Sequence, residues 1–191
     1  MSEETPEKAE VPVKIDWGQA IGALQNVQSI ALRTEAIVGA EYVDELLEAL
    51  LRAFFIDDDK SATDVFDNRG PIGTFGARID LAFLLGLISE NERRMLDFIR
   101  KIRNEFSHSS KYIDFETSQV KNWCLNLFEM SKTAKAIFGK PIDFGDPETR
   151  FIFTVICLVL IFEERKKEIS RREKRQPITD DQIASLIQNL I

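Results

Sequence analysis

The segment from Ser89 to Ser110 constrains the fold most, because it combines a clear helix start with a regular apolar stripe. Ser89 and Glu92 have the spacing of a capping box, in which the serine caps the first turn and the glutamate reaches back to the backbone. Apolar side chains then recur at three- and four-residue steps, at Met95, Phe98, Ile99, Ile102 and Phe106. This periodicity predicts a helix with one buried face, ending near Ser109.

The same period recurs before and after this helix, and no segment alternates every second residue for long enough to indicate a sheet. We expect a short helix over residues 16–30 and a longer one over 34–55, in which Gly39 permits a close helix contact. The acidic run Asp57–Asp59 indicates a solvated turn. Further helices are expected from about residue 74 and from about residue 116, the latter ending before 139.

Residues 147–162 are apolar almost all round, which predicts a helix through the centre of the fold. Asp146 and Pro147 are a cap residue followed by proline at the first helical position. The β-branched content leaves a buried strand as an alternative, although the run into a basic helix end at 163–175 favours helix. A last capped helix over 179–191 is too short to be stable alone, so it must dock on this chain or on a partner subunit.

The composition is that of one globular domain, with 191 residues and a hydrophobic fraction of 44%. The sequence therefore predicts an all-α single-domain bundle of about six or seven helices over residues 15–191, preceded by a disordered acidic tail at 1–14. Cys124 and Cys157 stand apart, which indicates reduced thiols in a cytoplasmic protein. The apolar runs are shorter than a membrane span, and no pattern indicates a cofactor or a metal site.

Glycines at 70, 73 and 76 superficially resemble a phosphate-binding loop, in which glycine lets backbone amides approach an anion. No Lys-Ser or Lys-Thr pair follows them, and no strand pattern precedes them. A turn leading into the helix at about Thr74 explains the same residues.

The only histidine, His108, lies five residues after Arg103. Histidine can act as an acid or base near neutral pH, and arginine stabilises a phosphoryl transition state, so the pair is a candidate for metal-free RNA cleavage with Asn104 orienting them. On a continuous helix the two side chains are about 140° apart, and they would converge only at a helix end or across a dimer axis. Alternatively, Asn104, Ser107 and His108 close the helix end and Arg103 pairs with a carboxylate.

The net charge of −7 disfavours a protein that coats nucleic acid non-specifically. A local basic stretch nevertheless offers candidate nucleic-acid contacts at Arg165, Lys166, Lys167, Arg171, Arg172, Lys174 and Arg175. Four glutamates lie within the same stretch, so a solvated helix end is the alternative interpretation.

The hexamer Arg103–His108 resembles the Arg-x4-His signature of the HEPN superfamily. That resemblance implies a helical bundle, commonly a dimer, which is a metal-independent ribonuclease or toxin in some members and a non-catalytic binding module in others.

Residues 34–128 resemble the mannitol operon repressor (MltR/MtlR) family more extensively. The matching segments are Gly70-Pro71-Ile72-Gly73, Arg78-Ile79-Asp80-Leu81, Leu85-Gly86-Leu87-Ile88 and the Arg103–His108 hexamer. The resemblance implies transcriptional regulation. Because the chain is acidic and lacks a recognition-helix pattern, we expect a regulator that acts through a protein partner, as a homodimer without a catalytic role. A HEPN-type ribonuclease is the competing hypothesis.

Overall fold

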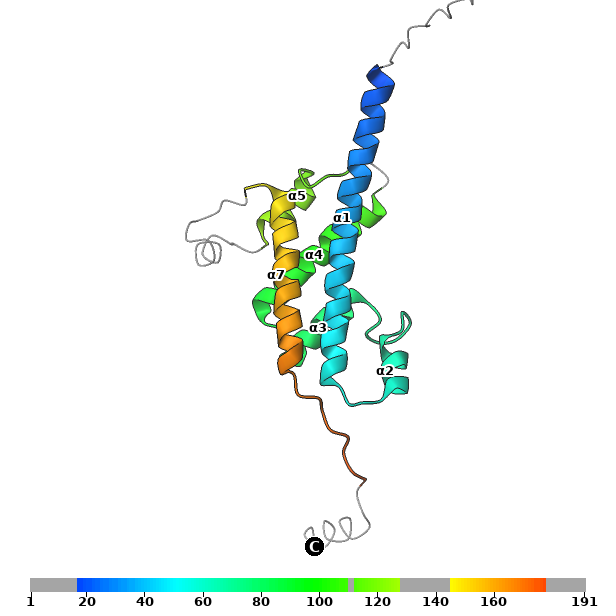
Figure 1. Cartoon of the computed structure of the whole chain (residues 1–191), viewed down its shortest axis with the longest axis vertical. Helices are drawn as coiled ribbons and strands as arrows, with labels where there is room; N and C mark the ends of the chain where they lie inside the picture. Colours follow the sequence, from blue (N-terminus) through cyan, green and yellow to red (C-terminus); the bar gives the residue numbers. More distant parts are fainter. Residues whose placement is uncertain (1–16, 110–111, 128–144, 178–191) are drawn as a thin grey trace, which may run out of the picture.

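The computed structural model describes residues 17–109, 112–127 and 145–177, and every regular element in them is a helix (Figure 1). The six helices are α1 (Trp17–Phe54), α2 (Asp59–Phe66), α3 (Phe75–Leu84), α4 (Glu90–His108), α5 (Ser118–Leu125) and α7 (Pro147–Glu168). The predicted all-α bundle is confirmed. Within these residues, no helix is long and apolar enough to cross a membrane.

Helix α1 is a single element of 38 residues, so the prediction of two helices at 16–30 and 34–55 was wrong. No proline or glycine interrupts the junction, and Ala31 and Leu32 are good helix formers. The Thr34 hydroxyl donates to the carbonyl oxygen of Ile30 at 2.8 Å, one turn back, so this polar side chain is satisfied within the continuous helix. The result is a helix longer than the body that it packs on (Figure 1).

The core is built where the second half of α1 packs against α7, α4 and α3. Phe115 links two of these helices, because its ring centroid lies 5.0 Å from that of Phe106 and 5.3 Å from that of Phe151. Gly39 gives α1 and α7 a close contact, since a Cβ atom there would lie 3.4 Å from the Phe151 ring. The close helix contact predicted at Gly39 is therefore confirmed.

The predicted helix starts are present as side-chain caps. Ser89 and Glu92 form both bonds of a capping box, at 3.3 and 2.6 Å. The Asp146 carboxylate accepts the N–H of Thr149 at 2.7 Å, immediately before the first helical residue of α7. Thr74 caps α3 in the same way. Each cap satisfies a backbone donor that the first turn leaves free.

Three expectations need correction. The acidic run at 57–59 opens a helix, because Asp58 caps α2 by accepting the Ser61 N–H, and α2 was not predicted. Helix α7 is not surrounded by protein, because it exposes an apolar row made of Ile152, Ile156 and Leu160. It ends at Glu168, so the basic helix end does not reach 175.

The remaining expectations concern the ends of the chain and the segment after α5. The strand alternative for 147–162 was wrong, because these residues are helical throughout. The helix predicted from about residue 116 to 139 begins as expected but ends at Leu125, with Asn126 as its C-cap, so its predicted length was wrong. The acidic tail at 1–14, the terminal helix at 179–191 and the stretch from 128 to 144 lie outside the described residues.

Candidate functional site

The Arg103–His108 hexamer stays helical to its end, so Arg103 and His108 lie on different sides of α4. Arg103 and Asn104 line a pocket of about 520 Å³ between α1, α3 and α4. His108 is outside this lining and is exposed. Within one chain the structure therefore brings Arg103 and Asn104 together and leaves His108 apart, so joint catalysis would require a second subunit.

The end of α4 is closed by a residue that the sequence did not single out. Arg33 of α1 donates through Nη1 to the carbonyl oxygen of Phe106 at 2.6 Å and through Nη2 to that of Ser109 at 3.0 Å. These carbonyls belong to the last turn, where no helical N–H remains to pair with them. The structure thus gives Arg33 the closing role that the sequence suggested for His108 and its neighbours.

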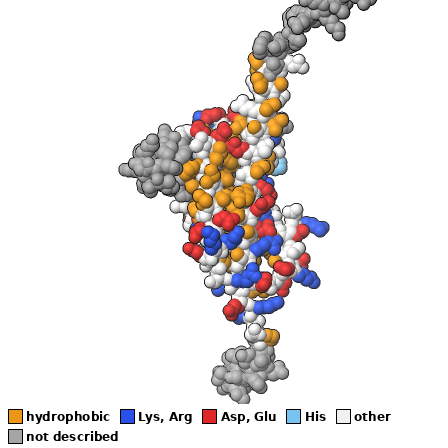
Figure 2. All heavy atoms as spheres, in the orientation of Figure 1, with side chains coloured by type: hydrophobic (Ala, Val, Ile, Leu, Met, Phe, Trp, Pro, Cys, Tyr) orange, Lys and Arg blue, Asp and Glu red, His pale blue; other side chains and the backbone are white. Residues whose placement is uncertain are grey.

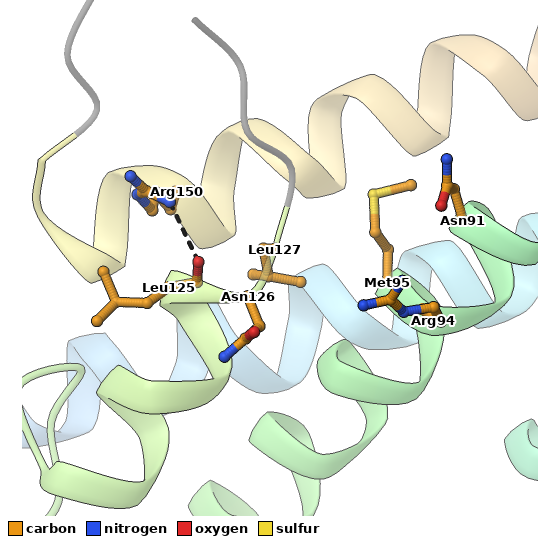
Figure 3. A pocket seen from close by; sticks show the side chains of 7 residues that line it. All are labelled: Asn91, Arg94, Met95, Leu125, Asn126, Leu127 and Arg150. Carbon is orange, nitrogen blue, oxygen red and sulfur yellow. Dashed lines mark hydrogen bonds between the residues drawn. The ribbon is translucent and has the colours of Figure 1, made fainter.

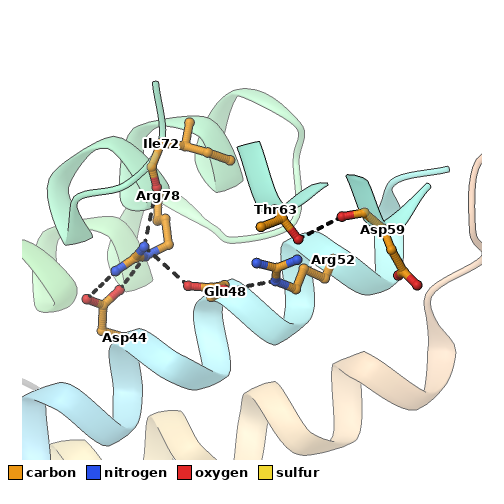
Figure 4. Close-up of polar contacts among 7 residues, drawn as sticks. All are labelled: Asp44, Glu48, Arg52, Asp59, Thr63, Ile72 and Arg78. Carbon is orange, nitrogen blue, oxygen red and sulfur yellow. Dashed lines mark hydrogen bonds and ion pairs between the residues drawn. The ribbon is translucent and has the colours of Figure 1, made fainter. Parts of the chain in front are cut away.

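Arg78 is the most strongly bound cation of the pocket (Figure 4). Its Nε and Nη2 donate to the two Asp44 carboxylate oxygens at 2.6 and 2.7 Å, and its Nη1 donates to the carbonyl oxygen of Ile72 at 3.3 Å. Glu48 lies 3.3 Å from the same guanidinium. Burial alone would lower the pKa of Arg78, but these carboxylates outweigh burial and raise it. The side chain ties α3 and the loop before it to α1.

Sequence reasoning missed this pair because 34 residues separate Asp44 from Arg78. The family resemblance held a hint, since its Gly70–Gly73 and Arg78–Leu81 segments contain the Ile72 acceptor and the arginine that binds it.

Two other arginines line the same pocket with fewer partners. Arg100 donates through Nη2 to Asp97 at 3.1 Å, while its Nε is buried without a hydrogen-bond acceptor. The Nε of Arg103 is also buried without an acceptor, and among the described residues this side chain has no ion pair. The sequence offered an alternative to catalysis in which Arg103 pairs with a carboxylate. The structure does not show that ion pair among the described residues.

A second pocket, of about 610 Å³, lies where the end of α5 meets α4 and α7 (Figure 3). Its charged lining residues are Arg94 and Arg150, and Arg150 donates to the carbonyl oxygen of Leu125 at 3.3 Å. Its described lining residues include no carboxylate, histidine or thiol, so they offer no acid–base pair. Across the described ranges, no three His, Cys, Asp or Glu side chains are grouped so that they could hold a metal ion.

The two cysteines are shielded thiols. Burial raises the pKa of Cys124 to about 12, against a smaller opposing effect of Arg150. Burial also raises the pKa of the half-buried Cys157. Because the thiolate is the reactive form, neither thiol is prepared for nucleophilic chemistry.

The candidate nucleic-acid residues mostly contact acidic or aromatic side chains of this chain. Arg165 forms a two-bond pair with the buried Glu92, at 2.8 and 3.1 Å, and also donates to the Leu87 carbonyl at 2.8 Å. Burial raises the pKa of Glu92, but Arg165 and Ser89 outweigh it, so the pKa is lowered. The other contacts are Lys166 with Glu163, Lys167 with Glu164, Arg171 with Asp57, Lys174 with Asp58, and Arg172 over the Phe54 ring, whereas Arg175 is exposed. The patch remains a prediction, with most of its charge balanced internally.

Exposed hydrophobic side chains gather over α1 and α7 (Figure 2). Where the two helices lie side by side, we call Val38, Tyr42, Ile152, Ile156 and Leu160 the apolar face. Residues 17–31 of α1 extend beyond the body, and we call them the projecting arm. Four large apolar side chains of this arm, Ile21, Leu24, Val27 and Ile30, are 54–69% exposed. Exposed apolar surface of this extent marks sites of protein contact.

Comparisons with known proteins support the fold. No protein-family model matches the chain, and no curated protein matches it. Among solved structures, a chain in the X-ray structure of the MtlR–HPr complex from Escherichia coli has a similar fold, with a TM-score of 0.50 and 19% sequence identity. The match covers 73% of this chain and 98% of that chain. The chain therefore shares the overall fold of MtlR, a protein solved in complex with a protein partner.

Proposed function

We propose that this chain is an MltR-like transcriptional regulatory protein that acts by binding another protein. The observation that carries the proposal is the fold shared with MtlR, a chain solved in complex with the protein HPr. The net charge of −7 and the internal pairing of the basic stretch support protein contact in place of direct DNA binding.

The apolar face is the surface that suits a protein partner. Ile152, Ile156 and Leu160 recur every fourth residue along α7, and Val38 and Tyr42 on α1 are also four residues apart. Two such parallel rows present a ridged surface of the kind that helices of another protein pack against. These side chains are not part of the core cluster, and their exposure suits them to contact with a partner.

The function can be tested with a gene deletion complemented by variants of the face. Wild type should restore the transcripts altered by the deletion, whereas Ile156→Arg should not, because a charge at the centre of the face prevents docking. Leu84→Arg is the matched control, since Leu84 is 79% exposed on α3 and lies outside the face. A deletion that alters no transcript, or full complementation by Ile156→Arg, contradicts the proposal.

The partner is tested directly with purified HPr from the same organism. We expect calorimetric binding to wild type and to Leu84→Arg, and none to Ile156→Arg. Circular dichroism of all three proteins separates lost binding from lost folding. If HPr binds none of the folded proteins, the partner is a different protein.

Self-association is the second part of the proposal and involves the projecting arm. Every described side chain from residue 18 to 31 is exposed or partly exposed, and a solitary stretch of this length is marginally stable in water. Leu24, Val27 and Ala31 follow one another at three- and four-residue steps, which is the spacing of a helix–helix seam. A second copy offers the same stripe and forms a closed symmetric pair.

Sedimentation equilibrium tests this association. Wild type should have the mass of a dimer, and the double variant Leu24→Glu/Val27→Glu that of a monomer. Gln28→Glu adds a charge to the same arm without removing an apolar side chain, and it should remain dimeric. A wild type that is monomeric at all concentrations would refute this part of the proposal.

A further inference from the structure

The apolar face is bordered, along α1 and at the start of α7, by carboxylates that form no ion pair with a described residue. We propose that the partner presents a basic amphipathic helix to this face. Its apolar ridge packs on the face, and its lysine or arginine side chains lie beside the carboxylates. The proposal rests on the function proposed above and adds the chemistry of the partner surface.

The α1 side of the face has an acidic charge that its own helix does not balance. From residue 34 to 51, α1 contains five acidic residues and no lysine or arginine. Glu41 and Glu45 lie three and seven residues after Val38, so helix geometry places both on the side of the apolar row. Both are exposed, and neither forms an ion pair with a described residue.

Cations of the other elements leave this charge in place. Arg78 attracts Glu41 electrostatically, but Asp44 and Glu48 already bind its guanidinium, at 2.6 and 3.3 Å. From residue 151 to 164, α7 contains no lysine or arginine. The cations that follow on α7 are bound by carboxylates, in the pairs Arg165–Glu92, Lys166–Glu163 and Lys167–Glu164.

Two more carboxylates lie where the face meets the start of α7. Glu148 precedes Ile152 by four residues, so it lies on the same side of α7 as the apolar row. Burial, followed by repulsion from Glu148, raises the pKa of Glu35 on α1. The two carboxyl groups therefore lie close enough to repel each other across the two helices. In Figure 2, acidic side chains border the upper end of the apolar surface, and most basic ones lie below it.

Charge also argues against the two occupants that this chain could supply. A second copy in a symmetric pair would place the same carboxylates opposite one another, and like charges across an interface weaken binding. The apolar segment at 179–191 contains Asp180 and Asp181 and no lysine or arginine, so it would add negative charge to the face. A different chain with a basic border fits both the apolar rows and the charge.

Two synthetic amphipathic helices of about 20 residues test the sign of the charge. Both have leucine at the same three- and four-residue steps, and the flanking positions are lysine in one and glutamate in the other. Fluorescence anisotropy measures their binding to the full chain at about 0.15 M ionic strength. Wild type should bind the lysine peptide about ten- to hundredfold more tightly than the glutamate peptide, because like charges oppose docking.

Three variants of the full chain locate the binding and its charge dependence. Ile156→Arg should lose the lysine peptide, because it interrupts the apolar face. Glu45→Lys should narrow the preference for lysine about three- to tenfold, since it replaces an attraction at the border with a repulsion. Glu105→Lys makes the same charge change at an exposed position of α4 and should keep the wild-type preference. Circular dichroism confirms that each variant is folded.

The proposal is overturned if wild type binds both peptides equally or binds neither. It is also overturned if folded Ile156→Arg keeps the lysine peptide, or if Glu45→Lys and Glu105→Lys narrow the preference equally. These outcomes are distinct from failure of the proposed function. Transcripts that depend on Ile156, together with equal binding of the two peptides, keep the regulatory function and remove only the basic partner. Selective peptide binding without a change in any transcript does the reverse.

Discussion

The two ends of α1 have opposite surroundings although they belong to one continuous helix. The core half, from Ala36 to Leu51, buries apolar side chains against three helices and anchors the buried charge of Arg78. The projecting arm exposes apolar side chains of similar size. The difference shows that the number of apolar side chains along a helix predicts neither how many of them are buried nor how much they contribute to the stability of the fold. Those depend on whether other elements are present to cover it.

The largest expected effect comes from breaking the charge pair of the core half. Asp44 and Arg78 are 3% and 9% exposed, so Arg78→Ala leaves a buried carboxylate without its counter-ion. We expect the free energy of unfolding to fall by about 3–5 kcal/mol, measured by urea denaturation. The double variant Arg78→Met/Asp44→Leu should lose much less, because it leaves no buried charge. Equal losses in the single and double variants would show that packing, and not the charge, dominates.

A pair of matched truncations tests the comparison itself. Leu47 is fully buried in the core half, and Leu24 is 69% exposed on the arm. Leu47→Ala should cost about 2–5 kcal/mol, whereas Leu24→Ala should stay within about 0.5 kcal/mol in the dissociated monomer. Both are read from urea denaturation at low protein concentration. A large loss for Leu24→Ala would mean that the arm packs on the body.

The pair between Glu92 and Arg165 sharpens the comparison, because it anchors α4 to α7 without α1. Glu92→Gln should lower the free energy of unfolding by about 1.5–3 kcal/mol at pH 7, as expected for hydrogen bonds to a charged group. Because the folded pKa of Glu92 is lowered from 4.5, the contribution is complete above pH 4.5 and is lost as pH falls through the folded pKa. If the difference in the free energy of unfolding between wild type and Glu92→Gln does not shrink in acid, the ionised Glu92 carboxylate is not its source.

The smallest effect is expected at the boundary between arm and core half. Burial, followed by repulsion from Glu148, raises the pKa of Glu35 above 4.5, and its Oε1 is buried without a donor. A raised folded pKa favours folding below pH 4.5, and this benefit is lost as pH rises through the folded pKa. Glu35→Gln should therefore stabilise by less than about 1 kcal/mol at pH 7. Thermal melts of wild type and Glu35→Gln at pH 4 and pH 7 measure this stabilisation. An equal stabilisation at the two pH values would refute the electrostatic cause.

Local signals predicted the helix starts and the buried stripe of α4. Ser89 with Glu92, and Asp146 with Pro147, act within one turn, so the sequence carries all the information that they need. Met95, Ile99, Ile102 and Phe106 are buried as the period indicated. These features depend on neighbours along the chain, which sequence reasoning can read.

Features that depend on distant residues were not predictable in the same way. The exposed row on α7 follows from the absence of a described helix over that side, which no local pattern encodes. The closing role of Arg33 depends on Phe106 and Ser109, which lie 73 and 76 positions further along the chain. At the candidate site the sequence identified Arg103 and Asn104, but Arg100 and the first turn of α3 entered the pocket only through packing.

The shielding of Cys124 and Cys157 makes the chain convenient for spectroscopy. With both thiols protonated near neutral pH, a maleimide dye reacts slowly with the folded native protein. A cysteine introduced in place of the exposed Leu24 would be labelled first. The motion of the arm and its distance from a second copy can therefore be followed by fluorescence with no native cysteine removed.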